Sequence, residues 1–463
     1  MPISEQVCRL RLTSSEGRAH GWGNMALTWA APGAETWNRL QTRRAPVASK
    51  ALTGPLKICL ISETLLAGVG RHIVDAASAL SARGHEVHLL YSPVRMDPQF
   101  LSAIKRLPTI RCHPIPMPHG LCVADILTFL QIKEYMRLNG PFDIVHGQSS
   151  KGGGYARLLK LFGAASVMYS PHAFVTLSPV VSFLKRLIYQ GIEVVLSQLT
   201  DTIVCTSHVE QEHARRLGIS PSKLTVIVNG SADVSGPDRQ TVRATLGLAP
   251  EHVVIGFVGR MEDQKAPQRL VEAAMRILPD LPQLRLLMIG DGPKRAFLES
   301  RLKDVGLADR ALWLGAVDAR QYMPAMDIFA LPSLYEGFAY VLLEALCTGL
   351  PIVSTPVGGT YESILPGVNG IIVPHDSPHE MAAALHRLVT DADLRSSMAQ
   401  ASSKRAAQFS IPRMVDAIET LYFNALSAHP QVAEAAPMAS VPQVRYRQSV
   451  LAVDGYRFVR RVY

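Results

Sequence analysis

The 463-residue sequence has no apolar run of about 18 residues, the length that a membrane-spanning helix requires. Its first residues lack the basic-then-apolar pattern of a signal peptide. The six cysteines form no C-x-x-C pair. We therefore expect a cytoplasmic protein of a reducing compartment, in which the cysteines are small core residues.

Two further absences narrow the chemistry. No D-x-D follows a predicted strand and no group of ligands has metal spacing, so we expect neither a metal ion nor another cofactor. The formal charge of +9 can attract any anion. No zinc-finger spacing and no aromatic-rich single-strand motif accompanies this charge, so we expect no nucleic-acid partner.

The balance of residue types is that of a folded α/β protein. Hydrophobic residues make up 48% and charged residues 18% of the chain. Short apolar runs alternate with stretches of helical period, as in β-α-β units around a parallel sheet. The first series of runs is 56–62, 86–92, 142–147, 167–171, 201–207 and 224–230. After a loop at 231–238, the second series is 253–260, 284–293, 311–315, 327–333, 351–355 and 370–374.

This repetition predicts two doubly wound, Rossmann-like domains. We expect the first domain at 56–235 and the second at 250–411, followed by a helix at 412–427. The N-terminal extension at 1–55 and the tail at 428–463 lack sustained periodicity, so neither predicts a fold and we expect poor order there.

The most informative segment is SLYEGFAYVLLEALCTGLPIVSTPVGGT, in which seven residues separate Glu336 from Glu344. We expect Glu336 in the loop before a helix and Glu344 about two turns inside it, so that both can face one ligand. The backbone N–H groups of Gly337, Phe338 and Ala339 are expected to point out of the helix start, where a diphosphate would fit. Any single match of this spacing also has an alternative interpretation, in which one glutamate caps the helix and the other is exposed to solvent.

This segment resembles the E-x7-E signature of glycosyltransferase family 4, the retaining transferases with the GT-B fold. In that fold two Rossmann-like domains face each other across a cleft. The resemblance covers about residues 55–427. It implies that Glu336 binds hydroxyls of the donor sugar and Glu344 those of the ribose. It also implies that the first domain binds the acceptor, that the second binds the nucleotide sugar, and that the helix at 412–427 crosses back to the first domain.

The segment VGRMEDQKAP resembles the family's G-R-x(4)-K motif, with Arg260 at a strand end and Lys265 near the next helix. Two fixed cations there would neutralise a pyrophosphate and stabilise the charge on the departing nucleoside diphosphate. They would do the work of Mg²⁺, so the transfer is expected to be metal-independent. Taken alone, either cation could instead be a loop residue that is exposed to solvent and binds no ligand.

Glycine turns complete the expected donor site. In IGDGPKR, Gly290 and Gly292 would permit close approach of the backbone to a nucleotide. By the family resemblance, Leu314 lies where members of the family contact the base of the nucleotide. An apolar residue at the end of a core strand would explain Leu314 equally well.

The segment SETLLAGVGRHIV contains Gly68, Val69 and Gly70 and resembles the family's first glycine loop. It lacks a full G-x-G-x-x-G, and no acidic residue follows at the distance of a ribose ligand, which disfavours a nicotinamide enzyme.

The segments HGQSSKGG and SPHAF follow two strands of the first series and resemble bacterial polysaccharide-assembly members of the family. The resemblance implies that His172 lies across the cleft from Glu336, close to the anomeric centre. Alternatively, His172 is a turn residue that packs beside a proline and binds no ligand.

Together these motifs predict a retaining glycosyltransferase that uses a nucleotide sugar, with UDP preferred over GDP. The acceptor is expected to be a glycan or a lipid-linked molecule of cell-surface or exopolysaccharide biosynthesis. Two alternatives remain: a catalytically silent GT-B-like nucleotide-binding protein, and a dinucleotide-dependent oxidoreductase.

The segment 178–199 bears on the acceptor, because its apolar residues recur at helical spacing around Lys185 and Arg186. A basic, apolar surface suits an anionic, lipid-linked acceptor, and hence peripheral contact with the inner face of the membrane. A core-facing helix with two solvated cations explains the pattern equally well. Further cations are expected on the preceding helix, at Lys151, Arg157 and Lys160.

Overall fold

The computed structural model describes residues 54–427, apart from 98–99, 101, 104–105, 107–108, 119, 121, 165 and 232–235. It also describes residues 447–453 and 456–462. The extension expected at 1–55 therefore lies outside the described residues except for its last two, as does the part of the tail from 428 to 446.

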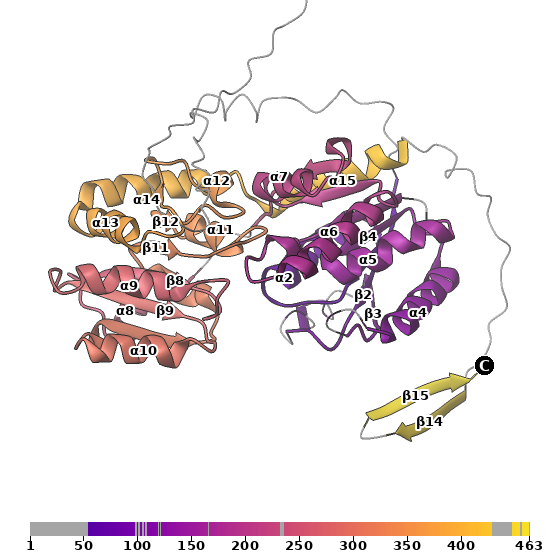
Figure 1. Cartoon of the computed structure of the whole chain (residues 1–463), viewed down its shortest axis with the longest axis horizontal. Helices are drawn as coiled ribbons and strands as arrows, with labels where there is room; N and C mark the ends of the chain where they lie inside the picture. Colours follow the sequence, from indigo (N-terminus) through magenta and orange to yellow (C-terminus); the bar gives the residue numbers. More distant parts are fainter. Residues whose placement is uncertain are drawn as a thin grey trace, which may run out of the picture. The chain divides into compact units, whose positions relative to one another are not determined.

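The first domain is built on a seven-stranded sheet in the order β3-β2-β1-β4-β5-β6-β7, and every neighbouring pair is parallel. Figure 1 draws this domain in indigo to magenta. Its strands are β1 (Lys57–Ser62), β2 (Glu86–Tyr91), β3 (Ile110–Pro114), β4 (Ile144–Gln148), β5 (Ser166–Ser170), β6 (Thr202–Cys205) and β7 (Leu224–Val226). Its helices are α2 (Ala67–Ala82), α4 (Ala124–Asn139), α5 (Ser149–Leu159), α6 (Phe183–Ser197) and α7 (His208–Arg216).

Helices cover both faces of this sheet, as alternate residues of β1 demonstrate. Ile58 and Leu60 belong to an apolar core that includes residues of α2, whereas Cys59 and Ile61 belong to another that includes residues of α4 and α5. Because successive side chains of a strand point to opposite faces, both faces of β1 are buried. The loops that follow the strands are therefore free to form a site at the carboxyl edge of the sheet.

The second domain has a six-stranded parallel sheet in the order β10-β9-β8-β11-β12-β13. Its strands are β8 (Val253–Val258), β9 (Leu284–Ile289), β10 (Ala311–Gly315), β11 (Ile328–Leu331), β12 (Ile352–Ser354) and β13 (Gly370–Ile372). Its helices are α8 (Arg239–Thr245), α9 (Pro267–Ile277), α10 (Arg295–Asp304), α11 (Tyr340–Cys347), α12 (Thr360–Ser363), α13 (Pro378–Thr390) and α14 (Ala392–Ala406).

The last helix of this series, α15 (Ile411–Ser427), packs on the first domain. Its buried residues Met414, Val415, Ile418 and Tyr422 join the core that contains α2. None of the helices in the described ranges is long and apolar enough to cross a membrane.

Each strand predicted from the sequence is present, and the described residues contain three further strands that the apolar runs do not predict. Strand β3 has the sequence IRCHP and is half exposed at the edge of its sheet, so it lacks the apolar run of the central strands. Strands β14 (Arg447–Val453) and β15 (Tyr456–Val462) form an antiparallel pair within the tail for which no fold is predicted. The sequence signal for this hairpin is the Asp-Gly pair at 454–455, a frequent two-residue hairpin loop.

Candidate functional site

The two motifs of the second domain meet at the carboxylate of Glu336. This residue lies between β11 and α11, and its side chain is buried. Its Oε1 atom accepts hydrogen bonds from Lys265 Nζ at 2.6 Å and from Ser333 Oγ at 2.8 Å. Its Oε2 atom accepts a longer bond of 3.4 Å from Gln264 Nε2. A buried acid and a partly buried cation are thus held side by side at the carboxyl edge of the sheet.

Arg260 lies farther from this carboxylate than Lys265. Its side chain is 63% exposed and forms an ion pair of 2.8 Å with Glu262. It also donates a 3.3 Å hydrogen bond to Gln264 Oε1, and Gln264 in turn contacts Glu336. The structure therefore joins Arg260 to the acidic residue through Gln264, and leaves the guanidinium open to solvent.

Glu344 lies nearer to the helix start than the sequence predicts. Helix α11 begins at Tyr340, so Glu344 is about one turn inside it rather than two, because residues 337–339 are not yet helical. Its Oε1 accepts a 2.8 Å hydrogen bond from Arg71 of the first domain. Burial raises the pKa of Glu344, while the charges of Arg71 and Arg320 oppose the rise.

The loop between Glu336 and α11 lies directly against the first domain. A Cβ atom added to Gly337 would lie 2.5 Å from the Ala173 nitrogen and 2.7 Å from the His172 carbonyl carbon. The Ser207 hydroxyl donates a 2.7 Å hydrogen bond to the Gly337 carbonyl. The structure thus brings the backbone of the His172 loop against Gly337, the residue after Glu336.

Phe338 and Ala339, the other expected donor-binding residues of this loop, are buried in the core of the second domain. Only their backbone is therefore available to a ligand. The Ala339 N–H already donates a 3.3 Å hydrogen bond to the Gly358 carbonyl.

The His172 loop has an unusual backbone. His172 has φ +55° and Ala173 has φ +96°, values that cost a residue with a side chain about 1–3 kcal/mol each. Oε1 of the buried Glu210 accepts a 2.6 Å hydrogen bond from the Ala173 N–H, which holds this conformation. The His172 imidazole contacts Gln148 Oε1 at 2.7 Å, and its ring centroid lies 4.7 Å from that of His72.

The expected glycines of the first domain lie in the first turn of α2 rather than in a loop before it. A Cβ atom on Gly68 would lie 3.1 Å from the ring of Tyr340, and one on Gly70 would lie 2.8 Å from the Leu65 carbonyl carbon. Close packing against backbone thus requires glycine at position 70, whereas a Cβ at Gly68 would press on the side chain of Tyr340. Val69 is partly buried beside them.

The glycines after β9 have a similar explanation. Gly290 has φ +125° and Gly292 has φ +151°, and added Cβ atoms would lie 2.0 Å from the Gly259 carbonyl oxygen and 2.7 Å from that of Met261. Two loops of the protein itself therefore approach each other here. Leu314 on β10 is partly buried and packs against the core of the second domain.

Four residues near these motifs are not among the site residues predicted from the sequence. Three of them contact a predicted residue: Arg71 contacts Glu344, Gln264 contacts Glu336 and Gln148 contacts His172. The fourth, Glu210, binds the N–H of Ala173 beside His172. All but Glu210 stand inside quoted motifs, and their position there is the available signal. The four residues are Arg71, Gln148, Glu210 and Gln264.

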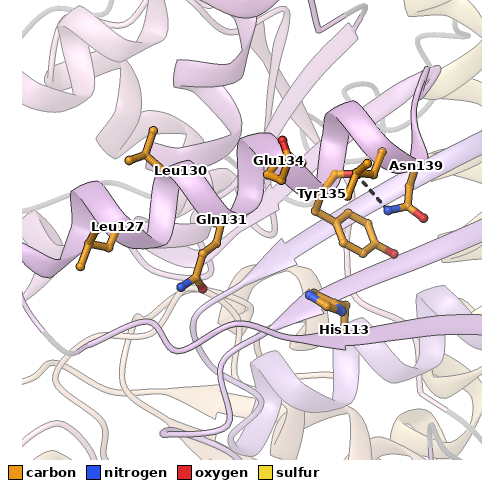
Figure 2. A pocket seen from close by; sticks show the side chains of 8 residues that line it. His113, Leu127, Leu130, Gln131, Glu134, Tyr135 and Asn139 are labelled. Carbon is orange, nitrogen blue, oxygen red and sulfur yellow. Dashed lines mark hydrogen bonds between the residues drawn. The ribbon is translucent and has the colours of Figure 1, made fainter. Parts of the chain in front are cut away.

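Among the described residues, no group of three or more histidine, cysteine or acidic residues could hold a metal ion. A cavity of about 740 Å³ lies between β3 and α4 in the first domain (Figure 2). It contains none of the predicted site residues, and its lining is His113, Leu127, Leu130, Gln131, Glu134, Tyr135, Leu138 and Asn139.

Comparison with known proteins gives matches in both domains. Residues 66–231 match the family described as Glycosyltransferase Family 4, and residues 252–391 match Glycosyl transferases group 1. An Escherichia coli protein, UDP-Gal:alpha-D-GlcNAc-diphosphoundecaprenol alpha-1,3-galactosyltransferase, is 30% identical over 65% of this chain and 80% of its own. A D-inositol 3-phosphate glycosyltransferase of Actinosynnema mirum is 27% identical over 77% of this chain and 92% of its own.

Solved structures share the architecture. Anabaena HepE in complex with UDP and glucose has a TM-score of 0.68 at 22% identity, covering 79% of this chain and 99% of its own. Sucrose-phosphate synthase of Thermosynechococcus elongatus also has a TM-score of 0.68, at 20% identity, covering 80% of this chain and 100% of its own. Identities this low bear on the fold alone, and the sequence matches supply the family. The chain therefore belongs to the family 4 glycosyltransferases and has the GT-B fold.

Proposed function

We propose that this glycosyltransferase is a retaining enzyme that moves a sugar from a UDP-sugar to a glycan or lipid-linked acceptor. The observation that carries the proposal is the partly buried Lys265–Glu336 pair beside the His172 loop. UDP is supported by the name of the Escherichia coli relative. That relative's name also gives a diphosphoundecaprenol-linked acceptor, which supports a role in cell-surface or exopolysaccharide biosynthesis.

In this proposal the cations bind the donor's diphosphate. Lys265 exchanges part of its contact with Glu336 for a phosphate oxygen, and the exposed Arg260 closes on the other phosphate. The carboxylate of Glu336 then accepts hydrogen bonds from hydroxyls of the sugar, and Glu344 accepts them from the ribose. Because both cations are fixed before the bond breaks, they stabilise the charge that develops on the departing diphosphate.

The glycine segments and the loop backbone are proposed to complete the donor site. The backbone of Gly337, Phe338 and Ala339 would face the diphosphate at the start of α11. The turns that contain Gly68, Val69, Gly70, Gly290, Gly292 and Leu314 would bound the nucleotide.

We propose that the departing diphosphate itself accepts the proton of the acceptor hydroxyl, so that attack occurs on the same face of the sugar. The anomeric configuration of the product, measured by NMR, tests this step. A retained configuration supports it, and an inverted product contradicts it. We also propose that the transfer needs no metal ion, and therefore expect the rate to be unchanged by EDTA.

The central experiment removes each partner of the Lys265–Glu336 pair. Glu336→Gln and Lys265→Ala should each lower transfer by about 10²–10³-fold without unfolding the protein, because each removes charge stabilisation at the reacting centre. Matched controls are Glu272→Gln on α9 and Lys303→Ala on α10, both exposed. A thermal-shift screen of UDP, GDP and ADP sugars identifies the donor, and a folded protein that binds and transfers none of them would overturn the proposal.

Helix α6 supports a further part of the proposal, contact of the first domain with a membrane. Its apolar residues face outward, since Phe183 is 77% and Leu184 is 68% exposed, whereas Glu193 and Ser197 are buried. This arrangement contradicts the alternative of a core-facing helix. It is what a helix lying in a lipid interface requires.

The cations expected to assist this surface are engaged within the first domain. Arg157 is 1% exposed and donates to Glu193 at 2.7 Å. Lys151 pairs with Asp125 at 2.5 Å, and Lys160 also has an acidic partner. The proposed contact is therefore carried by the apolar side chains, with Lys185 left as an exposed cation.

Liposome flotation tests the membrane contact. The full chain should float with vesicles that contain anionic lipid, and Phe183→Gln should weaken flotation several-fold, since it removes an exposed apolar side chain. Phe297→Gln is the matched control, because Phe297 is 58% exposed on α10 of the second domain. A wild-type chain that stays wholly in the unbound fraction removes this part of the proposal.

A further inference from the structure

Three histidines from separate segments of the first domain gather near the proposed reaction centre. His72 lies on α2, His146 on β4 and His172 in the loop after β5. The rings of His72 and His172 meet edge to face at 4.7 Å. His146 is held between two hydroxyls, those of Tyr422 at 2.8 Å and Ser170 at 2.9 Å.

A side-chain amide fixes the proton position of two of these rings. His172 Nε2 lies 2.7 Å from Gln148 Oε1, an oxygen that can only accept a hydrogen bond. Nε2 of His172 must therefore carry the proton, and Nδ1 keeps a lone pair. By the same reasoning His72 Nδ1 donates to Asn229 Oδ1 at 3.0 Å.

The surroundings of His172 keep its ring uncharged. Burial holds the pKa of His172 well below its usual value, and the neighbouring His72 and His146 lower it further. The acidic group closest along the loop is Glu210, which is occupied by the N–H groups of Ala173 and Thr206. On the second domain, Glu336 precedes Gly337 in the chain and forms an ion pair of 2.6 Å with Lys265.

We propose that Gln148 is a positioning residue for the transfer reaction: it holds His172 as the Nε2–H tautomer, so that Nδ1 accepts a hydrogen bond from a sugar hydroxyl. This inference rests on the proposed function of the site. An imidazolium in the same place would have no acceptor atom, and its charge would oppose the positive charge that develops at the anomeric carbon. The amide side chain satisfies both needs, because its oxygen accepts the hydrogen bond from Nε2–H and brings no charge.

The pH dependence of transfer tests the proposal. In Gln148→Glu a carboxylate faces Nε2 and favours the imidazolium, so the pKa of His172 rises. We expect this variant to match the wild type at high pH and to lose kcat by about tenfold per pH unit below the raised pKa. Gln148→Met lacks the acceptor and should lose kcat by about tenfold at every pH, with little change in the KM of the donor.

The control for added charge is Gln131→Glu on α4, an exposed residue of the first domain. Its pH profile should follow that of the wild type. The proposal is overturned if Gln148→Glu shows the same profile as this control, or if Gln148→Met keeps the wild-type kcat.

A second measurement needs no activity. Long-range ¹H–¹⁵N NMR of the full chain with labelled histidine should show a pyrrole-like Nε2 and a pyridine-like Nδ1 for His172, assigned by its loss in His172→Asn. A pyrrole-like Nδ1 or an imidazolium at neutral pH would refute the tautomer. If the wild type transfers no sugar while this tautomer is observed, the proposed function fails separately from the inference about Gln148.

Discussion

Arg71 donates a 2.8 Å hydrogen bond to Glu344, and the two residues are 273 positions apart in the sequence. The contact joins the first turns of α2 to the E-x7-E helix of the other domain. The two side chains are only 15% and 14% exposed, so the ion pair is largely shielded from water. A ribose bound by Glu344 would have to share this carboxylate with Arg71.

The Arg71–Glu344 pair should matter for stability. Arg71→Met leaves a mostly buried carboxylate without its partner, so we expect the free energy of unfolding to fall by about 3 kcal/mol. Adding Glu344→Gln to the same chain should restore part of this loss, because it removes the orphaned charge. Urea unfolding of the two single variants and the double variant measures the coupling.

The matched control for this cycle is Arg216→Met on α7, whose partner Glu212 is 45% exposed. We expect a change within about 0.5 kcal/mol there, since exposed pairs contribute little. An equal effect at Arg71 and Arg216 would refute the importance of the pair.

Gly337 should tolerate no side chain. In Gly337→Ala the new Cβ would lie 2.5 Å from the Ala173 nitrogen, so the His172 loop and the loop of Glu336 would have to move apart. A displacement of about 1 Å at a reacting centre costs about 10²-fold in rate, and we expect a loss of at least this size in kcat. Gly154→Ala on α5 is the control, because a Cβ there meets nothing within 4 Å. It should keep full activity and gain about 0.5–1 kcal/mol of stability.

Glu210 should be necessary for the conformation of the His172 loop. It is fully buried, and its Oε2 accepts a hydrogen bond from Thr206 N at 2.7 Å in addition to the bond from Ala173 N. Glu210→Ala leaves these buried donors unpaired, at about 1–3 kcal/mol each. We expect lower stability and loss of transfer, whereas Glu212→Ala on the exposed side of α7 should change neither. Full activity of Glu210→Ala would show that the His172 loop keeps its conformation without Glu210.

The neutral histidines should make the protein less stable in acid. Burial lowers the pKa of His72 to about 4, whereas its unfolded value is about 6.5. The unfolded state therefore binds the proton first, and the free energy of unfolding falls as the pH drops from about 6.5 to about 4, by about 3 kcal/mol for this residue. His72→Gln should flatten this dependence, and His386→Gln, an exposed residue of α13, should leave it unchanged. The measurement is urea unfolding at several pH values.

Helix α6 shows that the periodicity of apolar residues predicts a helix but not which of its faces is buried. The spacing of apolar residues from 178 to 199 predicts a helix with two unlike faces, and this helix is present. Which face is buried depends on its neighbours. The buried Arg157 draws Glu193 inward through an ion pair, so the apolar side is left outside. That choice is made by a contact between two helices and cannot be read from either one alone.

The sequence by itself determined the two series of strands and the positions of the E-x7-E and G-R-x(4)-K motifs at strand ends. Such features are local, because a run of apolar residues or a short spacing specifies them without reference to the rest of the chain. Only the tertiary structure decided which motifs meet: Lys265 with Glu336, Arg71 with Glu344, and Gln148 with His172. These contacts depend on the order of strands in each sheet and on close backbone approach at Gly337, and both arise from packing between segments that are distant in the sequence.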